Sequence, residues 1–468
     1  MAGRYWLETL GCPKNQVDSD KIEGLLRGEG YEPAGGPDAA DLVVVNTCAF
    51  IEAAREESIG TVLELASAKK QGARLVVTGC LAERYGAELA DSMPEVDRIA
   101  GFGMDLTGPG GPQRERSVPV VLGSRRAGTT STPAAAGLQR EVPAFDLLNL
   151  ARPAGGRPWA YVKVAEGCDR NCGFCAIPSF RGPQRSRTAA SVLEEVEALD
   201  AEEIVLVAQD LVSWGRDASR RADMREAPGG DDGWPRGLVD LVRAVSERTE
   251  RTRLLYLYPS GLTEELIEVV GDSGCPYYDL SLQHVSQPLL RRMRRRGDAD
   301  TFAAKVARIR DLYPGAVLRS SFIIGYPGET EEDHDALLEF LRDVELDWVG
   351  FFAYSEEEGT YAAGLPGKVP APLVAERTRE CSELQDRVTA HKRAALVGTT
   401  CRVLVDAPGQ ARSYREAPEI DGIVQVPEHL AAGTWAEVRV VEATGPDLVA
   451  VVDEPAARQV AQPEGRSR

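Results

Sequence analysis

Three cysteines near the middle of the chain, Cys168, Cys172 and Cys175, share one short loop in a CxxxCxxC spacing. Three soft thiolate ligands can bind three irons of a cubane iron–sulfur cluster. No fourth cysteine follows nearby, so one iron keeps an open position at which a small molecule can bind. A zinc site or three chance thiols are the alternatives. Zinc usually takes four ligands in paired spacings, and no histidine lies near this loop. The spacing therefore predicts a catalytic iron–sulfur cluster.

Three further cysteines, Cys12, Cys48 and Cys80, each follow an apolar run in the first hundred residues. The runs cover residues 4–10, 41–47 and 74–78. Helical patterns separate them, which predicts a parallel sheet that binds ligands at the carboxyl ends of its strands. A single cysteine there is more often a buried small side chain. Three at equivalent strand ends instead predict a second cluster, again with a free corner.

The rest of the chain must position these cysteines, and its patterning predicts an α/β protein of several domains. We assign residues 1–103 to an N-terminal parallel α/β domain and 104–158 to a linker rich in Gly and Pro. A second β/α domain is expected over 159–393 and a small β domain over 394–462. The linker has one stretch, 118–122, that could carry a short ordered segment.

Six apolar runs alternate with helical patterns in the second domain, which predicts an incomplete (β/α)6 barrel. The runs cover residues 159–165, 203–209, 253–258, 277–283, 316–324 and 348–354. The Cys168–Cys175 loop follows the first run, so we expect it at the carboxyl face, where barrel enzymes hold their active sites. A polar stretch at 216–236 is expected to be a loop insertion. From 394 onward, short β runs split by turns predict a small antiparallel barrel of the oligonucleotide-binding type.

The chain has 468 residues and nine cysteines, and its 54 basic and 73 acidic residues give a net charge of −19. An acidic chain is a poor non-specific binder of nucleic acid. No apolar run approaches the length of a membrane span, and Met1 leads directly into a strand rather than a signal peptide. Free cysteines in such a chain indicate metal binding rather than disulfides. We therefore expect a cytoplasmic protein.

The CxxxCxxC loop, which has Phe174 between its last two cysteines, resembles that of the radical S-adenosylmethionine enzymes. The whole chain resembles a methylthiotransferase of this superfamily, which has a three-cysteine N-terminal domain, a radical barrel and a C-terminal TRAM domain. Its motifs resemble the RimO-type branch, which modifies a ribosomal protein, more than the branch that modifies tRNA. The matching stretches are Thr9–Ser19, Cys175–Gly182, Leu255–Pro259, Leu282–Ser286, Phe352–Thr360 and Ala417–Gly422. Ser281 and Tyr361 stand where proline is common in the family.

The resemblance implies two 4Fe–4S clusters and S-adenosyl-L-methionine as cofactors. The cluster on Cys168, Cys172 and Cys175 would cleave S-adenosylmethionine to a 5′-deoxyadenosyl radical, using an electron donor. The radical would take a hydrogen atom from the β-carbon of an aspartate in ribosomal protein S12. A radical is needed because an unactivated C–H bond is too weakly acidic for a base to deprotonate. The cluster on the other three cysteines would hold or donate sulfur, and a second S-adenosylmethionine would supply the methyl group.

The resemblance also places the glycine-rich run 323–330, with Gly325, Gly328 and Glu329, beside S-adenosylmethionine. An ordinary strand-to-helix turn is the alternative for this run, and the two are compatible. Gln209, at the end of its strand, is a further candidate for contact with cofactor or substrate. We expect the basic run 291–296 to be a solvated helix end rather than a nucleic-acid contact.

The end of the chain bears on the choice of substrate. Residues 400–468 contain seven basic and eleven acidic residues, so their net charge is −4. This favours a basic protein partner over tRNA, with a merely structural β-domain as the alternative. Two rival functions stay open at this point, which are tRNA adenosine methylthiolation and a non-catalytic iron–sulfur carrier. We expect His284 to be structural. Cys275, Cys381 and Cys401 lack ligand-spaced companions and are expected to be buried bystanders.

Overall fold

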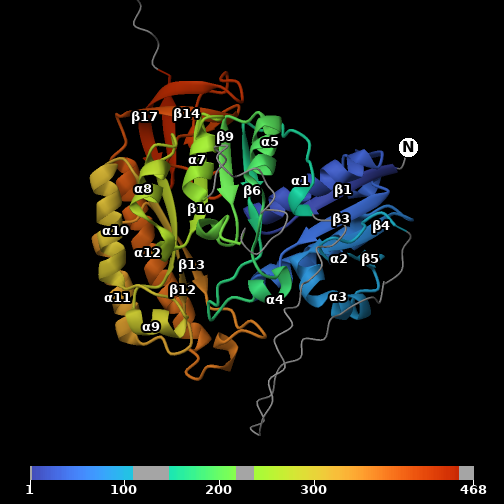
Figure 1. Cartoon of the computed structure of the whole chain (residues 1–468), viewed down its shortest axis with the longest axis horizontal. Coiled ribbons are helices and arrows are strands. Elements are labelled where there is room, and N and C mark those ends of the chain that lie inside the picture. Colours follow the sequence, from blue (N-terminus) through green and yellow to red (C-terminus); the bar gives the residue numbers. More distant parts are fainter. Residues whose placement is uncertain (1–2, 109–146, 218–236, 453–468) are drawn as a thin grey trace, which may run out of the picture.

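The computed structural model describes residues 3–108, 147–217 and 237–452, and Figure 1 shows their arrangement. Within these ranges no helix is both long and apolar enough to cross a lipid bilayer. The short segment expected at 118–122 and nearly all of the insertion expected at 216–236 lie outside the described residues. The same holds for the tail after residue 452.

The N-terminal region folds as expected into a parallel sheet. Its strands are β1 (Gly3–Thr9), β2 (Tyr31–Pro33), β3 (Leu42–Thr47), β4 (Arg74–Gly79) and β5 (Arg98–Ile99), in the order β2-β1-β3-β4-β5. Helices α1 (Pro13–Gly28), α2 (Glu52–Ala68) and α3 (Cys80–Ser92) connect them. Every residue of β3 is buried, as a central strand covered on both faces requires. Strands β2 and β5 are too short to show a pattern in the sequence.

The six expected strands of the second unit are confirmed, and they form one parallel sheet. They are β6 (Trp159–Lys163), β9 (Glu203–Val207), β10 (Arg251–Leu257), β11 (Tyr277–Gln283), β12 (Val317–Ile324) and β13 (Trp348–Ala353). The order is β13-β12-β11-β10-β9-β6, so β6 and β13 are the two edges of an open sheet. A short hairpin of β7 (Ala165–Glu166) and β8 (Arg185–Ser186) brackets the Cys168–Cys175 loop.

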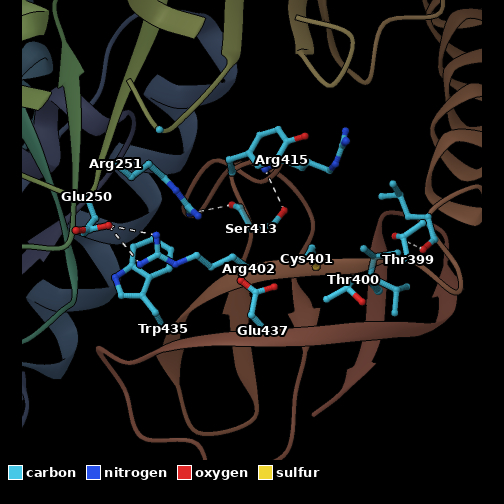
Figure 2. Close-up of a pocket in the computed structure, with 15 residues that line it drawn as sticks. Glu250, Arg251, Thr399, Thr400, Cys401, Arg402, Ser413, Arg415, Trp435 and Glu437 are labelled. Atoms are coloured by element: carbon cyan, nitrogen blue, oxygen red, sulfur yellow. Dashed lines mark hydrogen bonds and ion pairs between the residues drawn. The ribbon is translucent and has the colours of Figure 1, made fainter. Parts of the chain in front are cut away.

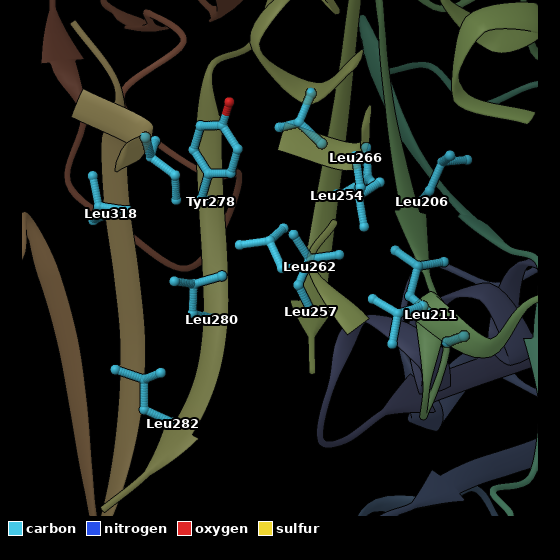
Figure 3. Packing of buried hydrophobic residues seen from close by; sticks show 14 of the residues in the cluster. Leu206, Leu211, Leu254, Leu257, Leu262, Leu266, Tyr278, Leu280, Leu282 and Leu318 are labelled. Carbon is cyan, nitrogen blue, oxygen red and sulfur yellow. The ribbon is translucent and has the colours of Figure 1, made fainter. Parts of the chain in front are cut away.

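Helices cover the outer face of this sheet, where the largest apolar core lies. They are α5 (Ala189–Leu199), α7 (Leu238–Ser246), α8 (Glu264–Gly271), α9 (Gln287–Arg292), α10 (Ala299–Leu312), α11 (Glu331–Val344) and α12 (Ala371–Ala394). The short helix α4 (Ile177–Arg181) instead packs against α3 of the N-terminal unit. Figure 3 shows strand leucines such as Leu206, Leu254 and Leu280 in the same buried cluster as Leu266 of α8. Burying such side chains contributes about 1.5–3 kcal/mol each.

The C-terminal strands close into a small barrel. They are β14 (Thr400–Ala407), β15 (Gln410–Arg412), β16 (Val424–Gln425), β17 (Trp435–Thr444) and β18 (Asp447–Val451), in the closed order β14-β15-β16-β18-β17. The pairings are antiparallel, as expected, except that β16 and β18 run parallel.

The loop of residues 413–421, between β15 and β16, fills the amino end of the six-stranded sheet. Tyr161 donates its hydroxyl proton to the Pro418 carbonyl at 2.7 Å, and Trp348 donates to the Arg415 carbonyl at 2.8 Å. Tyr277 bonds the Asp421 carboxylate at 2.6 Å. Three strands are thereby bound to this loop, two through its backbone carbonyls and one through a carboxylate, and no sequence pattern predicts these contacts.

The N-terminal unit contacts both edges of the open sheet. At the β6 edge, Lys163 forms a buried ion pair with Asp18 of α1. Beyond β13, the buried carboxylate of Glu357 accepts from Arg55 of α2 and Arg84 of α3, each at 2.6 Å. The N-terminal unit therefore bridges the gap that a six-stranded barrel leaves open.

A second buried charge cluster centres on Glu203 at the start of β9. Its carboxylate lies 2.7 Å from Arg253, 2.9 Å from Arg412 and 3.4 Å from Arg251. Burial raises the pKa of Glu203, but the three guanidinium groups outweigh burial and hold its pKa at about 2. Because Arg412 belongs to β15, this cluster ties the small barrel to the sheet.

Replacing Glu203 with glutamine should lower the free energy of unfolding by about 3–5 kcal/mol, since Arg251 and Arg253 lose their counter-charge and Arg412 keeps only Asp406. A carboxylate with a depressed pKa stabilises the fold above its unfolded value of 4.5 and loses that contribution as pH falls toward about 2. Wild-type stability should therefore drop across this window by an amount that Glu203→Gln does not show. Urea unfolding followed by circular dichroism at several pH values measures both effects.

Glu197→Gln is the matched control, because its pair with Arg248 lies at the surface. We expect a change below about 1 kcal/mol there. Equal losses in the two variants would contradict a special role for the buried cluster.

Candidate functional site

The N-terminal cysteines lie at the carboxyl ends of three neighbouring strands. Cys12 follows β1, Cys48 follows β3 and Cys80 follows β4, and these strands are adjacent in the sheet. Gly11 adopts a left-handed φ of 98°, and a Cβ there would stand 2.8 Å from the Cys48 Cβ. Gly11 therefore allows the β1 and β3 ends to approach closely, and the three thiols gather as the sequence predicted.

Asn15 of α1 connects the three strand ends. Its Nδ2 donates to the carbonyls of Leu10 at 2.9 Å and Thr47 at 3.0 Å, and its Oδ1 lies 3.7 Å from the Cys80 sulfur. Both carbonyls belong to residues at the ends of sheet strands. Asn15 therefore holds the edge in register, a role that sequence reasoning missed because one asparagine in a helix gives no signal.

The three N-terminal thiols differ in their electrostatic surroundings. Burial raises the pKa of Cys48 to about 12 and also raises that of Cys80. Burial acts in the same direction on Cys12, but the charges of Lys14 and Arg181 outweigh it and lower the Cys12 pKa. Cys12 is thus the thiol of this trio that most readily loses its proton to become a metal ligand.

The second trio lies on the loop after β6, at the carboxyl end of the six-stranded sheet. Burial raises the pKa of Cys168 to about 11 and that of Cys175 to about 12. Gly173 docks the loop across the sheet, since its N–H donates to the Met293 carbonyl and its carbonyl accepts from Ala362, both at 2.8 Å. A Cβ on Gly173 would stand 2.8 Å from the Tyr326 hydroxyl. The loop therefore reaches from β6 to the end of β12.

Arg295 corrects one expectation from the sequence. The run 291–296 was predicted to be a solvated helix end, and Arg291, Arg294 and Arg296 are indeed exposed. Arg295 instead is buried and donates to the Cys172 sulfur at 3.4 Å. Its guanidinium stacks over the Tyr258 ring at 4.1 Å. The turn after α9, where Arg294 has a φ of 57°, directs this one side chain inward.

A buried network of four charged side chains joins the two trios. Arg181 at the end of α4 lies 3.0 Å from the Cys80 sulfur and 2.7 Å from Glu166. Glu166 also accepts from Lys163 at 2.7 Å, and Lys163 pairs with Asp18. Burial raises the Glu166 pKa, but Arg181 and Lys163 outweigh burial and hold it well below its usual range. Sequence reasoning missed the network, although Glu166 and Arg181 directly flank the cysteine loop.

Gln209 lies where the sequence placed it, at the end of β9. Its Nε2 donates to Glu166 at 2.8 Å, while its Oε1 is buried without a hydrogen-bond partner. A buried amide oxygen without a partner costs about 1–3 kcal/mol. Such an atom fits a position that a bound molecule would complete.

The glycine-rich run after β12 is held by its own contacts. Gly325 and Gly328 have left-handed φ values of 81° and 87°. The Gly325 N–H donates to Glu329 at 2.6 Å, and Glu329 accepts from Arg377 of α12 at 2.8 Å. Burial raises the pKa of Glu329. The ordinary turn expected as an alternative is therefore present. Tyr326, between the glycines, reaches the cysteine loop at Gly173.

The donor sets fit iron–sulfur clusters in kind and in grouping. Each trio supplies three thiols, the ligand type that such clusters take. No group of three His, Cys, Asp or Glu side chains surrounds a single metal position in the described parts of the chain. A cubane cluster needs no such compact group, because each thiolate binds a different iron.

The remaining candidates lie away from both trios. His284 is buried, accepts the Ser286 N–H at 3.1 Å, and has a pKa lowered by burial to about 4. Cys275 and Cys381 are buried, but Cys401 is only partly so. Cys401 lines a cleft of about 460 Å³ between the sheet and the small barrel. Figure 2 shows this cleft, in which Arg402 lies over Trp435.

Three family models match successive parts of the chain. The model described as Uncharacterized protein family UPF0004 covers residues 4–101, the Radical SAM superfamily model covers 162–341 and the TRAM domain model covers 397–452. A solved structure of the radical S-adenosylmethionine methyltransferase TsrM from Kitasatospora setae, with cobalamin and a 4Fe–4S cluster bound, is 15% identical. That match covers 92% of this chain and 83% of the other, with a TM-score of 0.42.

Curated relatives match almost the whole chain. Ribosomal protein uS12 methylthiotransferase RimO of Saccharopolyspora erythraea is 39% identical over 95% of this chain and 94% of its own length. The protein of the same name from Moorella thermoacetica is 40% identical over 93% and 95%. That of Chloroflexus aurantiacus is 38% identical over 95% and 98%. The chain therefore belongs to the RimO family of radical S-adenosylmethionine methylthiotransferases, enzymes that use 4Fe–4S clusters and S-adenosylmethionine.

Proposed function

We propose that this enzyme adds a methylthio group to the β-carbon of an aspartate in ribosomal protein uS12. It would consume two S-adenosylmethionine molecules, a sulfur donor and electrons from a reductant. The observation that carries the proposal is the pairing of two cysteine trios, at the carboxyl ends of two sheets, through the buried contact of Arg181 with Cys80 and Glu166. Relatives named for this activity match 95% of the chain.

The two trios would divide the chemistry between them. We assign one 4Fe–4S cluster to Cys168, Cys172 and Cys175 and the other to Cys12, Cys48 and Cys80. When bound, an open-cornered cluster with S-adenosylmethionine supplies one-electron chemistry, which an unactivated C–H bond requires. The protein's part is to hold the trios in fixed relation. The Lys163–Asp18 pair and the Arg181 contacts support this assignment.

S-adenosylmethionine would lie along the carboxyl end of the six-stranded sheet. The unpartnered Oε1 of Gln209 supports a contact with a donor of the cofactor or substrate. Gly325, Gly328 and Glu329 would border the same space from β12, with Tyr326 linking them to the cysteine loop. Burial in this region would limit access to a reactive intermediate and so limit its side reactions.

The small C-terminal barrel would face the basic protein substrate. Its exposed charges are mainly acidic and include Glu419, Glu428, Glu437 and Glu442. By contrast, Arg412 is buried against Glu203 and does not reach the surface. An acidic outer face speeds the encounter with a basic protein and disfavours RNA.

We also propose the domain limits 1–103, 159–393 and 394–462, with 104–158 as linker. The three matched segments fall within these limits. Ribosomes are the site of the substrate, so we propose that the enzyme works in the cytoplasm with a cytoplasmic electron donor.

Mutations in the two trios should affect different steps of the reaction. Cys12→Ala should leave reductive cleavage of S-adenosylmethionine intact and abolish sulfur insertion, because only the second cluster is lost. Cys168→Ala should abolish both, because the radical is no longer made. Chromatography of 5′-deoxyadenosine and mass spectrometry of a uS12 substrate measure the two steps in reconstituted protein.

Cys275→Ala is the control for loss of a buried cysteine outside both trios, and it should retain both steps. An active Cys168→Ala variant would overturn the assignment of the radical cluster. Wild-type protein that never cleaves S-adenosylmethionine would instead indicate an iron–sulfur carrier.

Deletion of the gene should remove the methylthio group from uS12 and leave tRNA unchanged. Mass spectrometry of ribosomal proteins and of tRNA nucleosides from the same cells tests both, and complementation with the Cys12→Ala variant should fail to restore the modification. Loss of a tRNA methylthio group with uS12 unaltered would assign the enzyme to tRNA instead.

A further inference from the structure

Each cysteine trio has one sulfur within reach of a buried guanidinium. Arg181 Nη2 lies 3.0 Å from the Cys80 sulfur, and Arg295 Nη1 lies 3.4 Å from the Cys172 sulfur. Both arginines are only 6% exposed. Burying an arginine is costly unless its charge and its donors find partners. Each trio thus has one buried arginine beside one of its sulfurs, and this recurrence indicates a functional role.

Arg181 reaches the N-terminal trio from the other unit. It ends α4, the helix that begins two residues after Cys175, so the segment carrying the radical trio also provides this donor. Its second donor nitrogen bonds Glu166 at 2.7 Å, and Nη2 also bonds the Asn15 side chain at 2.9 Å. These partners hold the guanidinium in one orientation, so its position against Cys80 is determined by the fold.

Arg295 reaches the radical trio from another segment of the chain. It follows α9, stacks over the Tyr258 ring at 4.1 Å, and donates to the Ser281 carbonyl. The Arg170 guanidinium lies over the same Tyr258 ring, 3.9 Å from its centroid. The charge of Arg170 is neutralised by Asp210, whose Oδ2 accepts from Arg170 Nε at 2.7 Å. Arg295 is thereby oriented by a ring and a carbonyl, with its charge directed to the Cys172 sulfur.

A guanidinium keeps its charge at all accessible pH values. Hydrogen bonds to the sulfurs and the local net charge are the main protein controls on the reduction potential of an iron–sulfur cluster. Reduction adds negative charge, so a fixed cation beside a ligand sulfur favours the reduced form. Removing that cation should make reduction harder.

We propose that Arg181 and Arg295 are positioning residues that each raise the reduction potential of one cluster. Arg181 would act on the cluster that includes Cys80, and Arg295 on the cluster that includes Cys172. The inference rests on the proposed function, because it requires a cluster at each trio. The potentials of the two clusters are then set separately, because the arginines come from different segments. Arg181 ends α4, and Arg295 follows α9.

The test measures each cluster alone. Replacing the three cysteines of one trio with alanine leaves the other trio to bind a single cluster, whose potential is followed by electron paramagnetic resonance during a redox titration. Arg181→Met should lower the reduced-to-oxidised ratio of the N-terminal cluster about tenfold at a fixed potential. For a one-electron couple this is a midpoint about 59 mV more negative. Arg181→Met should not shift the radical cluster, and Arg295→Met should give the opposite pattern.

Lys163→Met is the matched control for Arg181. Lys163 belongs to the same buried network, through Glu166 and Asp18, and the network joins it to Arg181 rather than to a sulfur. Its loss should lower the free energy of unfolding. It should leave the midpoint of the N-terminal cluster nearly unchanged. Arg181→Lys keeps the charge, so it should shift the midpoint less than Arg181→Met. If Arg181→Met fails to fold, Arg181→Gln, which removes the charge but keeps hydrogen-bond donors, takes its place, and an unchanged midpoint there counts against the proposal.

The outcomes distinguish this inference from the proposed function. If a trio binds no cluster in protein that keeps both arginines, the ligand assignment and the inference are both overturned. If iron content is normal and neither midpoint moves in the methionine variants, only the inference is overturned. Equal shifts of both clusters by either variant would show a general charge effect and would also overturn it.

Discussion

A buried charge network at the junction of two sheets is the constraint on which the rest of the structure depends. Asp18, Lys163, Glu166 and Arg181 alternate in sign, and each is buried. Breaking one such pair costs about 3–5 kcal/mol because it leaves an unpaired charge in the interior. The network therefore holds the carboxyl edge of the N-terminal sheet against the carboxyl end of the six-stranded sheet. Chemistry that involves both trios requires this fixed relation.

The open six-stranded sheet also depends on its neighbours for closure. A full barrel closes on itself, whereas this sheet ends at β6 and β13. The N-terminal unit bridges the two edges through Asp18 and Glu357. The loop 413–421 of the small barrel seals the amino end, with Arg412 paired to Glu203. The N-terminal unit, which carries the second cysteine trio, is thus docked where the missing strands leave the sheet open.

Much of the fold could be predicted because its signals are local. All six strands of the open sheet were expected from apolar runs, since buried parallel strands are continuously hydrophobic. Strands β2 and β5 have three and two residues, too few for any pattern. Arg295 was misjudged because its neighbours in the run are solvent-exposed and differ from it only in the direction the backbone takes after α9. Arg181 and Glu166 carry no periodic signal, so their pairing was out of reach.

The sequence by itself determined which chemistry this protein can support. The CxxxCxxC spacing and three cysteines after three apolar runs specify two thiol trios, because ligand type and spacing are written locally. Only the tertiary structure decided that a helix following one trio places Arg181 at Cys80, and that Arg295 turns inward to Cys172. The physical reason is that burial and charge pairing depend on contacts between residues far apart in the chain. Those contacts exist only once the sheets have docked.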